Sequence, residues 1–490
     1  MAIVLGVAAC TCAAAVGPWC AISPDSVAYL EVARSLWTTG AFPAERLIRP
    51  PGYSVLMAPL LGSSDLPELS LRWLAAACWI GSSLLAVRLA RIELGGVASA
   101  AVGIGVATHA LLLTQSAFVL TELPFMPLML ASLLVAAEGR HGEGPSHRRV
   151  VVAGLLAGAA GLVRSVGLVL GPAIALSLLF RREWNVRRRT AAAAIFLLVV
   201  ALPHAAWSLR QARYPKLYGY DTIWTQARPI ENTAATGLDL QWRRFLAYGP
   251  LRLSEMRTAL IGDKVAWRLH RGDLGRATGW LVGGLAAAVV FGFLVQRRSA
   301  VDFFVAGTVG VLALWPWDEG PRFVAPLVPL LLVYCALAVR AAWTRWAGVR
   351  GVRWVIGAGV TAFAALHAAE FAATMGRLPA QSRKAEQRVA EMRKLADWLG
   401  RDGAGRPSVT AVTRPGDDAR TLIAGGAYLA HRRLHSMIET ESLHSEDLPG
   451  APGLLVIQSS LAKGDSGPSI RPLATVGELI VAKPSPRDYR

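Results

Sequence analysis

The feature that most constrains the fold is a series of long apolar segments between residues 2 and 375. A helix needs about 20 predominantly apolar residues to cross a hydrocarbon core about 30 Å thick. Of the 490 residues, 53% are hydrophobic and only 17% are charged, and the mean hydropathy is +0.41. These values exceed those of an ordinary soluble enzyme. The sequence therefore predicts a polytopic α-helical membrane protein.

We expect about eleven transmembrane helices. Their approximate limits are residues 2–22, 70–90, 97–115, 117–138, 150–164, 166–180, 190–209, 277–295, 300–316, 323–340 and 354–375. The two segments beside Arg164 are short, so one broken or re-entrant unit is an alternative to two spans there. The first segment lacks a positively charged start, which favours an uncleaved span over a signal peptide.

Arginines gather in alternate loops, and basic residues near short loops are retained on the cytoplasmic side during insertion. The arginines assigned to that side are Arg88, Arg91, Arg140, Arg148, Arg149, Arg181, Arg182, Arg187, Arg188, Arg189, Arg297, Arg298, Arg340, Arg345, Arg350 and Arg353. The loops 23–69 and 210–276 of the membrane domain, which we assign to residues 1–376, then lie outside. The remainder, 377–490, combines an amphipathic helix with the strand-like runs SVTAVT, LLVIQ and ELIVA. It is expected to form a small extracytoplasmic α/β domain.

Motifs of several function classes are missing from the sequence. The five cysteines lie in or beside apolar segments, and no CxxC, Walker loop, HExxH or GxSxG motif occurs. The net charge of +18 arises mostly from arginines that act as topology signals, and no nucleic-acid fold signature accompanies it. ATPases, zinc proteases, serine hydrolases and nucleic-acid-binding proteins are therefore not expected. The glycines Gly154 and Gly158 are expected to allow close helix packing.

Asp25 is the candidate catalytic residue. It follows Pro24 and opens a stretch in which Val27, Leu30 and Ala33 recur at helical spacing, which predicts a helix on the membrane surface. A carboxylate at the N-terminal end of such a helix is stabilised by the helix dipole. It is also placed to serve as a general base for an acceptor hydroxyl at the membrane boundary. A plain helix cap is the competing structural explanation.

Two charged residues interrupt the hydrophobic helices themselves. Glu122 lies at the predicted outer start of a helix, where an ionisable group is costly unless it faces protein or water. Arg164 has almost no polar company in its segment, so we expect it to pair with Asp25, with Glu122 or with a lipid phosphate. The competing explanations are a dipole-stabilised helix acid for Glu122 and simple snorkelling for Arg164.

Three further candidates for substrate binding lie at predicted outer boundaries. Arg49 and Tyr53 bound the turn RPPGY, in which prolines stiffen the backbone beside a cation suited to phosphate. Arg322 precedes a helix start in WPWDEGPRFVAPLVP. Arg210 is a weaker candidate at a similar level. Three tryptophans are expected to anchor the interface, namely Trp207, Trp315 and Trp317.

Together these segments resemble the GT-C superfamily of integral membrane glycosyltransferases, in particular the branch of the protein O-mannosyltransferases and the lipid A aminoarabinose transferases. The resemblance covers roughly residues 1–345. It rests on DSVAYLEVARSLWTTG with RPPGY, on TELPF, on GLLAGAAGLVRS and on PRFVAPLVP, in the family's order. One departure is that the O-mannosyltransferases carry two adjacent acids in the first loop, whereas Ser26 follows Asp25 here. This weakens the assignment of a protein acceptor.

The resemblance implies a sugar donor built on a polyprenyl phosphate and inverting transfer to a hydroxyl acceptor, whether lipid, glycan or protein. Transfer would take place on the extracytoplasmic face of a bacterial-type plasma membrane. Asp25 matches the first-loop catalytic acid, Arg49 a basic residue near the donor phosphate, and Glu122 the second-loop acid. Arg164 and Arg322 match basic positions with less defined roles. No particular cofactor is assigned, and a divalent cation beside the acids is an open alternative without a cysteine or histidine cluster to predict it.

Two other functions are compatible with many spans and embedded arginines. One is a polytopic transporter or flippase of anionic lipid-linked substrates. Against it, the sequence shows no internal repeat, and its longest polar segments lie on the predicted outer side. The other is a noncatalytic assembly partner with a degenerate glycosyltransferase fold, against which the presence of Asp25 and Arg49 argues.

Overall fold

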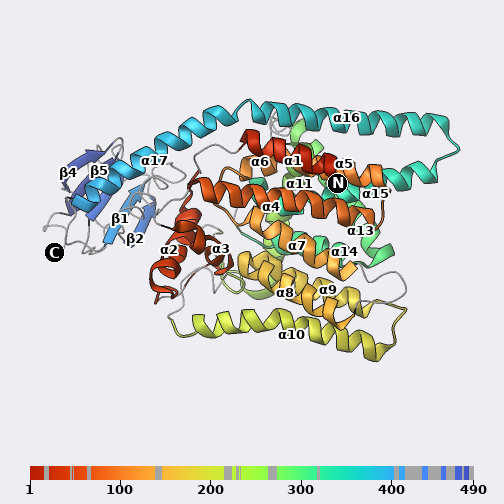
Figure 1. Cartoon of the computed structure of the whole chain (residues 1–490), viewed down its shortest axis with the longest axis horizontal. Helices are drawn as coiled ribbons and strands as arrows, with labels where there is room; N and C mark the ends of the chain where they lie inside the picture. The colour runs from red at the N-terminus through yellow and green to blue at the C-terminus, as the bar shows by residue number, and fades with distance from the viewer. Residues whose placement is uncertain are drawn as a thin grey trace. The chain divides into compact units, whose positions relative to one another are not determined.

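The protein is described from a computed structural model (Figure 1). The described residues are 1–15, 21–44, 47, 49–62, 68–137, 146–214, 223–227, 231, 233–262, 273–316, 320–401, 408–413, 433–439, 454–458, 470–476 and 479–484. Arg140 and Trp317, which the sequence assigned to a cytoplasmic loop and to the outer interface, lie outside these residues.

Helices make up most of the described chain. The α-helices are α1 (Ala2–Ala15), α2 (Pro24–Thr39), α3 (Gly52–Leu61), α4 (Glu68–Arg91), α5 (Gly96–Ala107), α6 (Ala110–Gln115), α7 (Glu122–Ala137), α8 (His147–Val163), α9 (Leu170–Leu179), α10 (Val186–Gln211), α11 (Gly237–Ile261), α13 (Asp273–Arg297), α14 (Ala300–Ala313), α15 (Val328–Arg345), α16 (Arg350–Met375) and α17 (Leu378–Arg401). Three short 3-10 helices connect some of them. They are η2 (Ser165–Val169), between α8 and α9, and η4 (Gly320–Phe323) and η5 (Ala325–Leu327), between α14 and α15.

Within the described residues, 5 helical segments are long and apolar enough to cross a membrane. They are Leu69–Arg91, Gly96–Gln115, Val186–Gln211, Ala325–Arg345 and Arg350–Asp397. Shorter apolar helices, including α7, α9 and α14, accompany them. The expectation of a mostly helical, polytopic membrane protein is confirmed, while the exact number of eleven spans stays a prediction.

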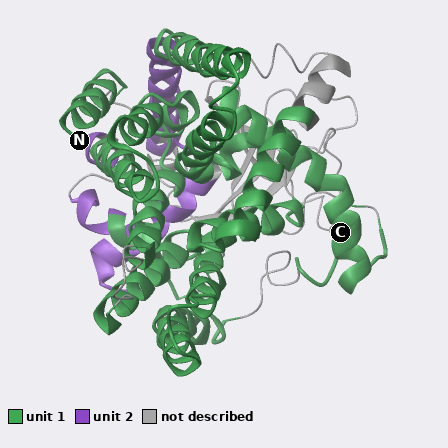
Figure 2. Ribbon diagram, turned by 90° about the vertical axis from the view of Figure 1, so that its right-hand side faces the viewer, with its two compact units in different colours: residues 1–16, 42–56, 72–377 green, residues 17–41, 57–71, 378–490 purple. Residues whose placement is uncertain are grey.

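The chain divides into two compact units (Figure 2). The first comprises residues 1–16, 42–56 and 72–377, and the second comprises 17–41, 57–71 and 378–490. The second unit thus combines the C-terminal tail with two pieces of the N-terminal region, including helix α2 with Asp25. Each unit is described by itself below.

The core of the first unit is a set of closely packed helices in which α8 lies against α7 and α10, and α9 lies against α10 and α14. Small residues permit this approach, as the sequence predicted for Gly154 and Gly158. A β-carbon built on Gly154 would lie 2.9 Å from Cγ1 of Val199, and one on Gly158 would lie 3.2 Å from Cγ of Pro203. Both neighbours belong to α10, so the glycines set the spacing of the α8–α10 pair.

The apolar segment around Arg164 is broken at that residue. Helix α8 ends at Val163, Arg164 has extended backbone angles (φ −148°, ψ 127°), and η2 then leads into α9. A β-carbon on Gly167 of η2 would lie 2.7 Å from the carbonyl carbon of Ala160, so η2 turns back onto the last turn of α8. The break leaves the Arg164 side chain at a helix end instead of within a continuous span.

In the second unit, helix α17 and five strands form the C-terminal part. The strands are β1 (Ser408–Thr413), β2 (Arg433–Glu439), β3 (Leu454–Gln458), β4 (Ile470–Val476) and β5 (Leu479–Pro484). They pair in the order β2-β1-β3-β5-β4, with β1 parallel to β2 and β3, and β5 antiparallel to β3 and β4. The runs SVTAVT, LLVIQ and ELIVA lie in or at β1, β3 and β5. Helix α17 buries Val389, Met392 and Leu395 and packs against β4.

Candidate active site

The N-terminal cap of helix α2 is Ser23 and not Asp25. The Ser26 amide donates to Oγ of Ser23 over 3.2 Å, and the Ser23 amide donates to Oγ of Ser26 over 2.9 Å. This reciprocal capping box satisfies two backbone donors at the helix start. The alternative in which Asp25 is the helix cap is therefore wrong. Asp25 lies in the first turn, half-buried, where the helix dipole favours a carboxylate.

The same helix buries the apolar face that the sequence predicted. Val27, Leu30 and Ala33 are buried, while Trp37 at the far end is half exposed. Ser26 is fully buried because its hydroxyl serves the capping box. The position after Asp25, which carries a second acid in the O-mannosyltransferases, thus has a structural role here.

Glu122 is the centre of a buried ion cluster in the first unit. The side chain begins α7 and is fully buried. Its Oε1 lies 2.8 Å from Nη1 of Arg164 and accepts a hydrogen bond from Nε of Arg322 over 2.5 Å. The guanidinium groups are largely shielded too, with side-chain exposures of 12% for Arg164 and 18% for Arg322. The second oxygen, Oε2, has no hydrogen-bond partner among the described residues.

Three separate chain breaks bring these groups together. Glu122 is the first residue of α7, Arg164 is the extended residue between α8 and η2, and Arg322 lies in η4 just before α15. Arg164 also donates from Nη1 to Oγ1 of Thr121 over 2.9 Å. Because α7 and α8 pack side by side in opposite directions, the start of one meets the end of the other. The pairing of Arg164 with Glu122 was one of the options that the sequence offered, and it is confirmed.

An aromatic ring extends the cluster to a third arginine. The guanidinium carbon of Arg164 lies 5.5 Å from the centroid of the Phe323 ring, and that of Arg252 lies 5.6 Å from the same centroid. Arg252 is buried in α11, where it pairs with Glu255 at 2.6 Å and donates to the carbonyl of Leu312 over 3.0 Å. Cations over a ring face are attracted to it, more strongly where water is excluded. Phe323 therefore links the two arginines.

The turn RPPGY reaches the same region through a backbone contact. A β-carbon on Gly52 would lie 2.7 Å from both the carbonyl carbon and the oxygen of Leu162, and 2.8 Å from the amide nitrogen of Val163. These atoms immediately precede Arg164. Arg49, three residues before this contact, is half-buried, and Tyr53, one residue after it, is buried. The structure thus brings RPPGY beside the end of α8 that carries Arg164.

Arg210, the weaker candidate, holds this first loop in place. It donates from Nη2 to the carbonyl of Pro43, and its guanidinium carbon lies 5.1 Å from the Trp207 ring centroid and 5.7 Å from that of Phe42. The neighbouring Gln211 accepts a hydrogen bond from the Leu47 amide over 3.2 Å. Trp207, expected as an interface anchor, also makes an edge contact with Phe42. These contacts fasten the segment before RPPGY to the end of α10.

The sequence did not reveal Arg252 and Phe323 as members of the cluster. Helix α11 lies within the long loop 210–276 and has an inverted pattern, because it buries Arg244 and Arg252 while Trp242 is 60% exposed. Hydrophobic periodicity alone therefore predicts that these arginines lie on the exposed face of the helix, whereas they lie on its buried face. The signal that was available is the spacing of the arginines themselves, eight residues apart and so close to one face of a helix.

The charge of the cluster favours an anion over a metal ion. Three arginines, 164, 252 and 322, gather around the two carboxylates of Glu122 and Glu255. Two guanidinium groups on Glu122 would repel a divalent cation, so this carboxylate does not fit a cation site. Among the described residues, no group of three or more His, Cys, Asp or Glu side chains comes together either. A cation beside Asp25 stays an untested alternative.

Comparisons with known proteins agree with this architecture. A family model described as dolichyl-phosphate-mannose-protein mannosyltransferase matches residues 49–207, the part that contains RPPGY, Glu122 and Arg164. A search of curated protein sequences found no match. Similar solved structures include ArnT from Cupriavidus metallidurans in the apo state and bound to undecaprenyl phosphate, each with 14% identity over 98% of this chain and 97% of that chain, at a TM-score of 0.59.

A second similar structure is the archaeal oligosaccharyltransferase AglB from Archaeoglobus fulgidus in complex with an inhibitory peptide and a dolichol-phosphate. It shares 12% identity over 94% of this chain and 70% of that chain, with a TM-score of 0.55. At such identities the likeness concerns the fold. The chain is an integral membrane protein with the GT-C glycosyltransferase fold, and its resemblance to the branch of the protein O-mannosyltransferases and lipid A aminoarabinose transferases is confirmed.

Proposed function

We propose that this protein transfers a sugar from a polyprenyl-phosphate donor to a hydroxyl acceptor, with inversion, at the membrane face where Glu122, Arg164 and Arg322 meet. The observation that carries the proposal is this largely buried arginine cluster around Glu122, beside RPPGY in a chain with the GT-C fold. Fixed cations that surround a departing phosphate stabilise the charge that develops there, which is a large contribution to catalysis.

The proposed reaction forms one bond and breaks one. The acceptor oxygen attacks the anomeric carbon, its proton passes to the Asp25 carboxylate, and the bond from the anomeric carbon to the phosphate oxygen breaks with its electron pair on the phosphate. Polyprenyl phosphate leaves with an additional negative charge. Arg49 and Arg164 would hold that phosphate, because guanidinium groups match phosphate oxygens in geometry and charge. Attack opposite the leaving group inverts the anomeric centre.

Glu122 would act by positioning the arginines, and Tyr53 by lining the donor site. One oxygen of Glu122 would fix both arginines, because Oε1 accepts a hydrogen bond from Arg322 and forms an ion pair with Arg164. Tyr53, buried one residue after Gly52, would line the donor side of RPPGY. Cations that are already in place need no reorganisation during the reaction. Because Glu122 holds these cations in place, we assign it a positioning role and not a catalytic one.

The proposed membrane face is supported by the arginine distribution. Glu122 starts α7, whereas Arg181 donates to the carbonyl of Ala136 at the other end of that helix over 2.7 Å. Arg297 likewise ends α13. Because basic residues are retained in the cytoplasm, the Glu122 end is proposed to face outward. A lipid-linked donor suits that face, since nucleotide sugars are cytoplasmic, and we place the protein in a bacterial-type plasma membrane.

The test is transfer by the purified protein in lipid from a panel of synthetic polyprenyl-phosphate sugars, with crude envelope acceptors and with polyprenyl phosphate release as the readout. We expect one donor to be consumed by the wild type and release to fall at least about 100-fold in Asp25→Asn, the usual size of a general-base contribution. Full activity of Asp25→Asn would refute the assignment of the base. If no donor is consumed while lipid-linked sugars cross vesicle membranes, the transporter interpretation replaces the enzyme.

A further inference from the structure

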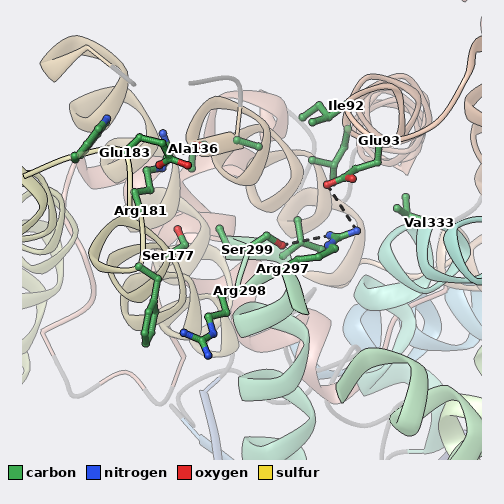
Figure 3. A pocket seen from close by; sticks show the side chains of 16 residues that line it. Ile92, Glu93, Ala136, Ser177, Arg181, Glu183, Arg297, Arg298, Ser299 and Val333 are labelled. Atoms are coloured by element: carbon green, nitrogen blue, oxygen red, sulfur yellow. Dashed lines mark hydrogen bonds and ion pairs between the residues drawn. The ribbon is translucent and has the colours of Figure 1, made fainter. Parts of the chain in front are cut away.

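A charged cavity lies at the end of helix α7 opposite to Glu122 (Figure 3). Its volume is about 140 Å³, and among its lining residues are Ala136 and Ala137, which end the helix that Glu122 begins. That helix has 16 residues, so at a rise of about 1.5 Å per residue the two sites are roughly 22 Å apart along it. The cavity is therefore separate from the cluster to which we assign sugar transfer.

Arg297 is the best-placed cation of this cavity. Its side chain is 18% exposed and lies 3.3 Å from Oδ1 of Asp302 and 3.7 Å from Oε1 of Glu93. Figure 3 shows Arg297 and Glu93 pointing toward each other across the cavity. Asp302 is already occupied, because it also accepts hydrogen bonds from Ser299 and Tyr334. The Nε and Nη1 donors of Arg297 are buried and make no hydrogen bond to described residues.

Arg298, the next residue, contributes a second cation and has a strained backbone conformation. Its φ of 51° lies in the left-handed region, which an arginine rarely adopts and which glycine adopts easily. Its side chain is exposed, and its guanidinium carbon lies 5.1 Å from the centroid of the Phe180 ring, which also lines the cavity. Strained backbone retained at a cavity wall points to a function for the side chain.

Two further features increase the attraction for an anion. Arg181 lines the cavity from the segment between α9 and α10. Helix α14 begins at the cavity wall with Ser299, Ala300 and Val301, so its positive dipole end lies there.

The charged groups and the remaining lining define the chemistry of the ligand. The lining holds three arginines, 181, 297 and 298, and two carboxylates, those of Glu93 and Glu183, while Asp302 lies 3.3 Å from Arg297. A phosphodiester suits this lining because its oxygens accept hydrogen bonds from guanidinium groups. Apolar side chains complete the wall, namely Leu89, Ile92, Val301 and Val333.

We propose that this cavity is a binding site for a phosphodiester headgroup, with Arg297 and Arg298 as its principal cations. The source of the phosphodiester is either a membrane phospholipid of the leaflet at this end of the helices or a soluble glycerophosphodiester. Arg297 supplies its Nε and Nη1 donors, which make no hydrogen bond to described residues, and the start of α14 contributes its positive dipole end. The carboxylates Glu93 and Glu183 suit a headgroup that also carries hydroxyl or ammonium donors.

The test is binding to the full chain in detergent, by native mass spectrometry for dioleoyl phosphatidylglycerol and by calorimetric titration for glycerophosphoglycerol. The variants are Arg297→Gln and Arg298→Gly, with Arg350→Gln as the matched control. Arg350 is an exposed arginine at the start of α16 that does not line the cavity. We expect each cavity variant to weaken binding about tenfold or more, as loss of a charge-assisted hydrogen bond does, and the control to bind like the wild type.

Arg298→Gly keeps the test decisive if Arg297→Gln fails to fold, because glycine suits the left-handed backbone and should leave the protein at least as stable. Phospholipid binding alone identifies the membrane as the source, and glycerophosphodiester binding identifies a soluble ligand. Unchanged binding in Arg298→Gly, or an equal loss in Arg350→Gln, would overturn the proposal. Arg164→Gln, at the far end of the helices, should leave this binding intact even if sugar transfer is lost.

Discussion

The ion cluster at Glu122 leads to a quantitative prediction about stability. Its Oε1 contacts two guanidinium groups, at 2.8 Å and 2.5 Å, and the carboxylate itself is fully buried. A hydrogen bond to a charged group contributes about 1.5–3 kcal/mol, and removal of one partner of a buried pair costs about 3–5 kcal/mol. Since Arg164 and Arg322 retain some exposure, we expect Glu122→Gln to lower the free energy of unfolding by about 3 kcal/mol.

A double-mutant cycle isolates the pair from the other effects of the substitution. Glu122→Gln, Arg322→Gln and the double variant would be unfolded reversibly in mixed micelles by titration with sodium dodecyl sulfate. We expect a coupling energy of about 2 kcal/mol. The matched control is Asp239 with Arg243 in α11, which lie 3.1 Å apart but are 57% and 62% exposed. There the coupling should be only about 0.3–0.5 kcal/mol, as for exposed helix pairs.

The comparison of the two cycles decides the matter. If the coupling at Glu122 is no larger than the coupling at Asp239, then water screens the cluster and the reasoning from burial fails. It would fail together with the proposal that Glu122 positions Arg164 and Arg322, because a weakly coupled carboxylate cannot fix the orientation of two guanidinium groups.

Three further predictions concern backbone fit, a buried ion pair and a helix cap. Gly52→Ala should reduce both sugar transfer and thermal stability, because its β-carbon would meet the backbone of α8 at 2.7 Å, whereas Gly249→Ala, with nothing within 4 Å, should be tolerated in both measurements. Arg244→Gln breaks two buried hydrogen bonds to a carboxylate at 2.7 Å each and should speed proteolysis of the segment before α11 several-fold, while Arg243→Gln should not. Ser26→Ala removes half of the capping box and should cost about 1 kcal/mol, seen as faster hydrogen exchange at the start of α2; unchanged exchange would contradict it.

The helical class and much of the cluster could be predicted from the sequence because charged residues in apolar segments are conspicuous. Glu122 and Arg164 each stand almost alone among hydrophobic residues, so the cost of their burial already required partners. Pairing between them follows once α7 and α8 run side by side in opposite directions. What the spacing did not specify is that both arginines meet one oxygen of Glu122, since this depends on the turn of η4.

The rest required tertiary information. Arg252 joins the cluster through the Phe323 ring and two backbone carbonyls, and no local pattern marks such partners. Helix α11 escaped recognition because Pro250 lies inside it and because its buried face carries arginines. The sequence left open whether Asp25 caps α2, since Asp and Ser both favour that position, and the structure shows Ser23 as the cap. The roles of Asp25, Arg49 and Tyr53 in sugar transfer stay predictions.

The contact of Gly52 with α8 has a consequence for how this protein and its relatives diverge. The colliding atoms belong to the main chain at Leu162 and Val163, so no exchange of the side chains at those two positions can make room for a larger residue at position 52. The side chains at positions 162 and 163 can therefore vary without any change at position 52. A glycine should persist at position 52 in relatives that keep the contact between α3 and α8. An exception would identify a lineage in which the first loop has been repositioned against the arginine-bearing end of α8.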